Sequence, residues 1–275
     1  MPFKCILISI YFLISISVSI GLLGQQPCLG HASEYTIEIV FFYSSESSIN
    51  NFKTLKITFD EYLNDYGSYT FQPFGERPVF EHHFEKNRQV LLLLSVWHYR
   101  QIYTNYHLKP LLVGTWQNKK YQRIVLSSKQ DTQNSDLADL DPLASANSIQ
   151  HTQSVLFEIL KTDTSSISVL MVPKDIDALI SVGLGIAKSA ISTESSLKQL
   201  EQINPLLYKN IKIIGESNER LRLVLSVPVE FNSVIDPLLK VLRDMSSNPK
   251  GRIILEMIGL DGFQEPDDLD LLNLE

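Results

Sequence analysis

The sequence predicts an α/β protein whose strands pair mainly in parallel. Short apolar runs rich in β-branched and aromatic residues alternate with segments whose apolar residues recur at helical spacing. One run, residues 89–96 (QVLLLLSV), is apolar almost throughout, which is typical of a strand covered on both faces. Strands that alternate with helices form mainly parallel sheets, and such sheets bind ligands outside the carboxyl ends of their strands.

Length and charge narrow the class of protein. The 275 residues can bury one large core or two smaller ones, and 44% of them are hydrophobic. The chain has 24 basic and 31 acidic residues, a formal charge of −7. No cluster of Lys or Arg offers the basic face that a polyanion needs, so we do not expect nucleic acid as a partner.

The first residues have the pattern of a signal peptide. Lys4 precedes an uncharged apolar run, residues 5–24, and the small residues before Ser33 favour cleavage after Ala32. An uncleaved anchor is the alternative, because about twenty apolar residues can just span a bilayer. Both cysteines, Cys5 and Cys28, lie in this segment, so the mature chain would have no disulfide. We expect a soluble, exported, periplasmic product.

The first half of the mature chain opens with a β-branched and aromatic run (YTIEIVFFY) that predicts a strand. The helix that follows is indicated by Phe52, Leu55, Phe59 and Leu63, which fall on one helical face. Strands are expected at residues 35–43, 69–74, 89–96, 111–115 and 121–127. Helices are expected at residues 49–66, 79–86 and 97–107.

The second half follows a polar connection at residues 129–141. Helices are expected at residues 145–161, 175–182, 195–203 and 234–245. Strands are expected at residues 167–172, 187–192, 211–214 and 221–227. Asp175 is expected to cap the helix that it begins, and the acidic tail after Pro266 is expected to fray.

These segments, taken in order, resemble the phosphate/phosphonate-type periplasmic substrate-binding proteins of ABC transporters. The resemblance runs from about residue 36 to residue 265 and depends on the collinear order of several pieces. They are residues 80–99 (FEHHFEKNRQVLLLLSVWHY), 108–113 (LKPLLV), 121–126, 177–190 (DALISVGLGIAKSA), 213–218 (IIGESN) and 254–263 (ILEMIGLDGF).

The resemblance implies a type II periplasmic-binding fold, with two lobes that close like a hinge on a ligand. Lobe one would hold residues 33–124 and 213–275, and lobe two residues 125–212, with crossings near Ser127 and Gly215. It also implies a monomer that carries a small anionic ligand to an ABC permease and catalyses no reaction.

Three hydroxyl-rich loops at strand ends are candidates for the anion site, because hydroxyls and helix amino ends attract oxyanions. Ser44 and Ser45 follow the first strand, although a simple turn explains them as well. Ser95 ends the strand of residues 89–96, and Tyr99 aligns with a ligand-facing Tyr of the family. Both Trp97 and Tyr99 could instead be core aromatics, and for Trp97 this is the preferred interpretation.

The third loop holds Ser145, Asn147 and Ser148, where the family has a Ser-Thr-Ser-Gly anion loop. These residues could also do no more than cap the following helix. Lys188 stands where the family commonly has an acidic residue that accepts a proton from the ligand. It could add positive charge to the site, or it could extend into solvent.

Other functions are disfavoured. His82 and His83 diverge by about 100° on a helix, so no metal site is expected, and no nucleotide loop, Ser-hydrolase motif or cofactor is indicated. An enzyme of this fold, as in thiamine-precursor synthesis, would need a Cys that the mature chain lacks. The main alternative to transport is a sensory or accessory module of the same fold, with altered or lost ligand binding, that signals to a membrane-bound kinase or cyclase.

Overall fold

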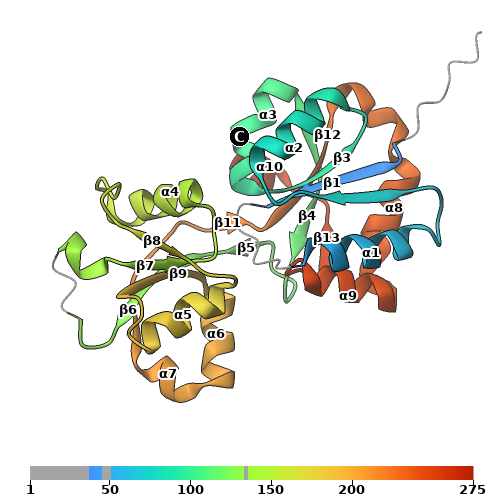
Figure 1. The fold of residues 1–275 in the computed structure, drawn as a ribbon. Coiled ribbons are helices and arrows are strands. Elements are labelled where there is room, and N and C mark those ends of the chain that lie inside the picture. Colours follow the sequence, from blue (N-terminus) through green and yellow to red (C-terminus); the bar gives the residue numbers. More distant parts are fainter. Residues whose placement is uncertain (1–36, 45–50, 133–135, 275) are drawn as a thin grey trace, which may run out of the picture. The chain divides into compact units, whose positions relative to one another are not determined.

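The computed structural model describes residues 37–44, 51–132 and 136–274 (Figure 1). The described residues all belong to one compact unit. The predicted signal peptide, residues 1–32, and Ser45 lie outside the described residues. Within the described ranges, no helix has the length and apolar character needed to cross a membrane.

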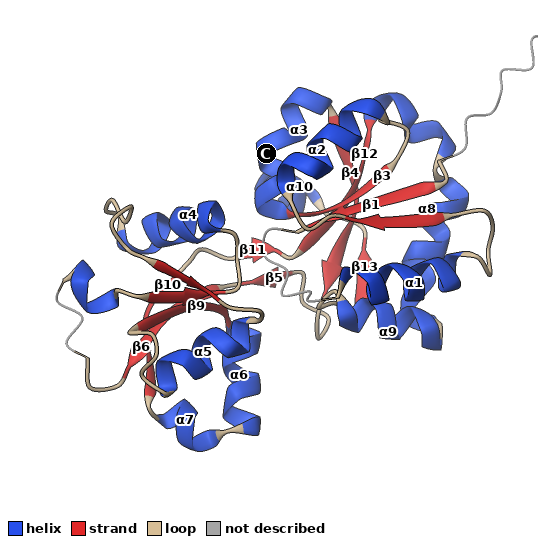
Figure 2. Ribbon diagram, in the orientation of Figure 1, coloured by secondary structure: helices blue, strands red, loops and turns tan. Residues whose placement is uncertain are grey.

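The larger of two main sheets has six strands in the order β13-β4-β12-β3-β1-β2 (Figure 2). Its strands are β1 (Ile39–Tyr43), β2 (Thr70–Pro73), β3 (Leu91–Ser95), β4 (Leu108–Thr115), β12 (Leu223–Pro228) and β13 (Gly262–Gln264). β1 pairs in parallel with β2 and β3, whereas β12 pairs antiparallel with β3 and β4, and β13 antiparallel with β4.

Helices cover both faces of this sheet. They are α1 (Phe52–Leu63), α2 (Arg77–Lys86), α3 (Val96–Tyr106), α8 (Asp236–Arg243), α9 (Pro249–Met257) and α10 (Asp268–Leu274). Successive side chains of β3 alternate between two cores, because a strand points neighbouring residues to opposite faces. Leu91 and Leu93 join the core under α1, α8 and α9, and Leu92 and Leu94 join the core under α2, α3 and α10.

The second main sheet has five strands in the order β10-β6-β9-β7-β8. They are β6 (Ile124–Lys129), β7 (Leu143–Ser145), β8 (Val169–Met171), β9 (Ser189–Thr193) and β10 (Ile211–Glu216). α4 (Ile149–Leu160) packs on one face, and α5 (Asp175–Gly183), α6 (Glu194–Ile203) and α7 (Pro205–Lys209) pack on the other. Short 3-10 helices lie at Leu137–Leu140, Val229–Val234 and Asp244–Ser247.

Both sheets are mixed, so the expectation of mainly parallel pairing is wrong. The chain leaves the first sheet by β4, passes through β5 (Tyr121–Gln122) and enters the second sheet at β6. It returns through β10, β11 (Arg220–Leu221) and β12. Outgoing and returning strands run in opposite directions, so β4 pairs antiparallel with β12, β5 with β11, and β6 with β10. The parallel pairs come from the strand–helix–strand units.

The passages between the sheets therefore lie at β5 and β11. Ser127 and Gly215, where the resemblance placed the crossings, belong to β6 and β10 of the second sheet, and Ser127 pairs with Ile213. Gly215 allows close packing, because a Cβ there would lie 2.3 Å from the side chain of Ile159 in α4.

The helix expected at residues 145–161 begins later. Leu143–Ser145 form β7, and α4 starts at Ile149, after its cap Ser148. The apolar pattern was correct, but three residues are too few to show a strand period.

The expectation of a frayed acidic tail is also wrong. α10 begins at Asp268, and its Asp270 is fully buried, where the carboxylate accepts hydrogen bonds from the Tyr121 hydroxyl at 2.6 Å and from Lys120. Leu274 is 1% exposed and lies in the core with α2 and α3. The hydrogen bonds of the buried Asp270 carboxylate therefore hold the C-terminal segment against the fold, although its acidic composition predicted exposure to solvent.

Candidate functional site

Three strands are followed by helices whose amino ends are capped by a Ser or Thr side chain. Ser95 ends β3 and accepts from the His98 N–H at 3.4 Å, Ser148 precedes α4 and accepts from the His151 N–H at 3.3 Å, and Thr193 ends β9 and accepts from the Ser196 N–H at 3.2 Å. The amino end of a helix carries partial positive charge. The carboxyl edges of both sheets therefore favour anions.

The loop after β7 uses its hydroxyls mainly within itself. The Ser145 hydroxyl hydrogen-bonds the Thr152 hydroxyl at 2.8 Å and accepts from the Asn147 N–H at 3.1 Å. Ser145 and Asn147 are buried, and Ser148 caps α4. Ser148 does cap α4 and Ser145 shapes the loop, and contact of these residues with a ligand stays a prediction.

Of the two aromatic residues at the start of α3, the one in the core is Tyr99 and not Trp97. Tyr99 is 2% exposed, stacks on Tyr103 and donates its hydroxyl hydrogen to the Leu108 carbonyl at 3.3 Å, so it is part of the core. Trp97, expected in the core, is only half-buried. The cause is helical geometry, since residues two apart on a helix point to different faces.

Trp97 belongs to a polar and aromatic cluster at the start of α3. Its ring centre lies 5.5 Å from that of His151 in α4. The Arg77 guanidinium lies over the same indole, 5.7 Å from its ring centre. Arg77 donates to Glu81 at 2.7 Å, and Glu81 lies 3.2 Å from Nε2 of His98. Burial lowers the pKa of His98 to about 4 and that of His151 to about 3, so both rings are neutral at pH 7.

Lys188 does not reach the site. β9 runs parallel to β7 with Ile191 level with Ser145, so Lys188 lies three residues, about 10 Å, from Ser145 toward the amino end of the strand. Its backbone N–H donates to the Pro142 carbonyl, and its exposed ammonium donates to the Ala138 carbonyl at 3.0 Å. Solvent exposure, the alternative for Lys188, is correct.

A cavity of about 600 Å³ offers a further candidate site. Ser44, at the carboxyl end of β1, lines it together with the start of α6 and the connecting strands. Cationic side chains on its wall are Lys119, Lys174, Lys198 and Arg222. In the described part of the chain, the three lysine ammonium groups form no ion pair.

Sequence reasoning missed the hydroxyl cluster that lines this cavity. The Thr193 hydroxyl lies 3.0 Å from that of Ser195 and 2.9 Å from that of Ser196, and all three residues line the cavity. The Thr-x-Ser-Ser pattern after the small-residue strand was the available signal, because such a cap at a strand end combines donors with a helix amino end.

Asp175 adds an acid to the same wall. Instead of capping α5, its Oδ2 accepts from the Thr193 N–H at 2.9 Å and from the Ser196 hydroxyl at 3.5 Å. Its Oδ1 is buried and has no hydrogen-bond partner among the described residues. Burial raises the pKa of Asp175 to about 6, partly offset by these hydrogen bonds. The site thus contains an acceptor that titrates near neutral pH.

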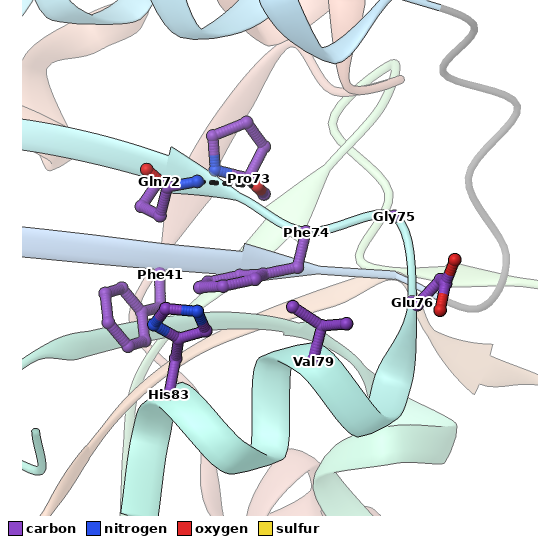
Figure 3. Close-up of a pocket in the computed structure, with 8 residues that line it drawn as sticks. All are labelled: Phe41, Gln72, Pro73, Phe74, Gly75, Glu76, Val79 and His83. Carbon is purple, nitrogen blue, oxygen red and sulfur yellow. Dashed lines mark hydrogen bonds between the residues drawn. The ribbon is translucent and has the colours of Figure 1, made fainter. Parts of the chain in front are cut away.

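A second hollow of about 450 Å³ lies between β2 and α2 (Figure 3). Phe74 packs edge-on to Phe41 with ring centres 5.0 Å apart, and His83 lies 5.4 Å from Phe74. Its wall is largely apolar, and the polar groups drawn there do not converge on one point, so we place no site in it. The described residues also contain no cluster of His, Cys, Asp or Glu suited to a metal ion.

No protein-family model and no curated protein sequence matches this chain. Solved structures do. XAC2383 from Xanthomonas citri, solved with chloride and also with ATP, matches in its chloride form with a TM-score of 0.62 and 14% identity over 87% of this chain and 95% of that one. PhnD1 from Prochlorococcus marinus, in complex with methylphosphonate, matches with a TM-score of 0.61 and 10% identity, covering 87% and 96%.

A binding-protein component of an ABC phosphonate transporter from Pseudomonas aeruginosa matches with a TM-score of 0.59 and 15% identity, covering 86% of this chain and 83% of that one. At these identities the similarity defines the fold. The chain has the two-lobed type II fold of periplasmic solute-binding proteins, as its sequence pattern predicted.

Proposed function

We propose that this chain is an exported solute-binding protein that captures a small phosphate- or phosphonate-like oxyanion and delivers it to the permease of an ABC importer. Lobe one would be built on the six-stranded sheet and lobe two on the five-stranded sheet. The boundaries expected at residues 124 and 213 would then move to β5 and β11, which would flex as the lobes close. The signal peptide would be removed after Ala32, and the monomeric product would act in the periplasm. The protein would catalyse no reaction; the ligand would stabilise the closed state relative to the open state.

The observation that carries this proposal is the hydroxyl cluster on the cavity wall. Thr193, Ser195 and Ser196 stand at the start of α6, where the helix dipole favours negative charge. Their hydroxyls can rotate to donate to an oxyanion, and Lys174 and Lys198 line the same cavity. A site with several donors and nearby positive charge suits a tetrahedral oxyanion.

Asp175 supports a ligand that keeps a proton. Its partnerless Oδ1 can accept a hydrogen bond from an O–H of a partly protonated phosphate or phosphonate, whereas fully ionised sulfate has no proton to donate and its charge is repelled by the carboxylate. Asp175, at the start of α5, would thus accept the ligand proton in place of the acidic residue that the family commonly has at the position of Lys188. The similar folds that bind methylphosphonate or serve phosphonate transport support the same ligand class.

A thermal-shift screen with phosphate, phosphite, methylphosphonate and sulfate tests the proposal. A ligand at 100 times its Kd stabilises the folded state by about 2.7 kcal/mol, which is readily measured as a higher Tm. We expect a shift with at least one protonatable oxyanion and a smaller one with sulfate. No shift with any of them at millimolar concentration would contradict transport of this class and favour the sensory module.

Two cap variants separate ligand contact from stability. Thr193→Val removes a hydroxyl on the cavity wall, and Asn248→Ala removes the cap of α9, whose side chain accepts from the Lys250 N–H at 2.8 Å away from the cavity lining. Each loses a helix cap, worth about 1 kcal/mol. Only Thr193→Val should lose most of the ligand-induced shift in Tm.

A further inference from the structure

The cavity is much larger than an inorganic oxyanion requires. A water-sized group takes about 30 Å³ of liquid volume, so a cavity of about 600 Å³ has room for about twenty such groups. Phosphate, with one central atom and four oxygens, would fill about a quarter of it. The remaining volume is of the size that binds organic ligands, which occupy pockets of about 300–1,000 Å³.

The wall changes character away from the hydroxyl cluster. Met257 and Ile258, at the end of α9, and Leu223, at the start of β12, line the cavity, and the first two are half-buried. Trp116 lines it as well. One part of the cavity therefore offers hydroxyls and charge, and another offers apolar and aromatic surface.

Trp116 stands on a tight turn between β4 and β5. It exchanges two backbone hydrogen bonds of 3.0 Å with Lys119, and the intervening Gln117 and Asn118 have φ of 53° and 59°. The left-handed conformation is unfavourable for Gln, so contacts with other residues must stabilise this turn.

Asp261 holds it. Its carboxylate accepts from the Gln117 N–H at 2.5 Å and from the Thr115 hydroxyl at 2.8 Å, while its own N–H donates to the Thr115 carbonyl at 2.8 Å. Strained backbone fixed by its surroundings is characteristic of ligand-contacting segments. Trp116 is half-buried, and among the described residues no other ring packs against its indole.

We propose that the cavity binds an organic oxyanion that carries an aromatic group, with the aromatic ring stacked on Trp116 and the oxyanion held by the hydroxyl cluster of Thr193, Ser195 and Ser196. This inference rests on the proposed function and narrows its ligand to aryl-bearing phosphonates or phosphate esters. Stacking on a preformed indole adds affinity beyond simple burial, and an aliphatic group of equal bulk cannot reproduce it.

Calorimetric titration with methylphosphonate, cyclohexylphosphonate and phenylphosphonate tests the inference. Phenylphosphonate should bind about tenfold or more tightly than methylphosphonate, and about fivefold more tightly than cyclohexylphosphonate, which matches its bulk without a π face. Trp116→Leu should bring the phenyl-to-cyclohexyl ratio to about one, while Trp116→Phe should keep most of it. Phe157→Leu, an exposed aromatic on α4 outside the cavity lining, is the control and should change neither ratio.

The outcomes separate this inference from the proposed function. If methylphosphonate binds as tightly as phenylphosphonate, or if Trp116→Leu keeps the preference for phenyl, the aromatic subsite is overturned and the oxyanion receptor stands. If none of the three phosphonates binds, the proposed function fails and the aromatic subsite fails with it.

Discussion

Asp175 is a residue whose ionisation works against the stability of the fold. Its pKa is raised from 3.8 to about 6 by burial. Between about pH 4 and pH 6 the folded state binds more protons at this residue than the unfolded chain does, so the free energy of unfolding falls as pH rises through that window. A shift of this size corresponds to about 3 kcal/mol at neutral pH. Under the proposed function, the hydrogen bond that Asp175 accepts from the ligand would offset this cost.

Replacing Asp175 by Asn should therefore stabilise the protein while weakening ligand binding. The variant keeps a side-chain oxygen for the Thr193 N–H but carries no buried charge. In urea denaturation at pH 7.5 we expect a gain of about 2–3 kcal/mol, shrinking as pH falls to about 4. Asp177→Asn, a half-buried residue in the same turn, should change little. A less stable Asp175→Asn at pH 7.5 would show that the carboxylate is stabilising.

At the residue scale, the sequence located strand-end hydroxyls but not their partners. Ser44 was predicted and lines the cavity, whereas Tyr99 was predicted and lies in the core with its hydroxyl bonded to Leu108. Thr193 was passed over because it ends a small-residue strand. Residue type shows that a group can donate a hydrogen bond, but only the packed fold shows which groups are already engaged.

At the scale of the element, α10 shows how one buried residue can fix a terminal helix. Leu274→Ala should lower the free energy of unfolding by about 2 kcal/mol, the lower end of the range for buried leucines, because the helix ends the described chain. Leu272, two residues earlier, is 70% exposed, and Leu272→Ala should change stability by less than about 0.5 kcal/mol. Equal effects of the two substitutions in urea denaturation would mean that α10 does not pack as described.

Long apolar elements were predictable, and short ones were not. β1 and β3 stand out because several consecutive apolar residues are buried on both faces of the sheet. β7 and β13 have three residues each, and α9 begins at Pro249 within a mixed segment, so their periodicity is too brief to detect. Their positions come from tertiary pairing, with β7 set between β8 and β9.

At the scale of the whole molecule, collinear order predicted the fold better than any single motif. Two sheets linked by paired strands β5 and β11 follow from one outgoing and one returning passage of the chain. The order of β-strands and helices predicts the two passages. The antiparallel pairing of the strands becomes clear only when the outgoing and returning strands are seen to lie side by side. This explains why the two-lobed class was predicted correctly and the parallel content of its sheets was not.

The stability of the whole molecule should depend on pH through its buried neutral histidines. His98 lies against the rings of Tyr43 and Phe80, with Glu81 at 3.2 Å and Arg77 beside Glu81. Burial lowers its pKa from 6.5 to about 4, and Arg77 lowers it further while Glu81 opposes the shift. Between those pH values the unfolded chain binds more protons at His98, so its contribution, present above about pH 6.5, is lost as pH falls toward 4.

His98→Gln should therefore flatten the acid side of the stability profile, whatever it does to stability at pH 7. The full contribution of His98 is about 3 kcal/mol, so the difference between variant and wild type should change by about that amount from pH 7 to pH 4. Comparing the two proteins cancels the contributions of Asp175 and His151 to the pH dependence of the free energy of unfolding, which have opposite and equal sign, respectively, to that of His98. His82→Gln, which replaces an exposed histidine next to Glu81 in α2, provides the control and should follow the wild-type profile. If His98→Gln also follows the wild-type profile in urea denaturation, His98 is protonated equally in both states, and the acid sensitivity of the fold must come from His151 or from other groups.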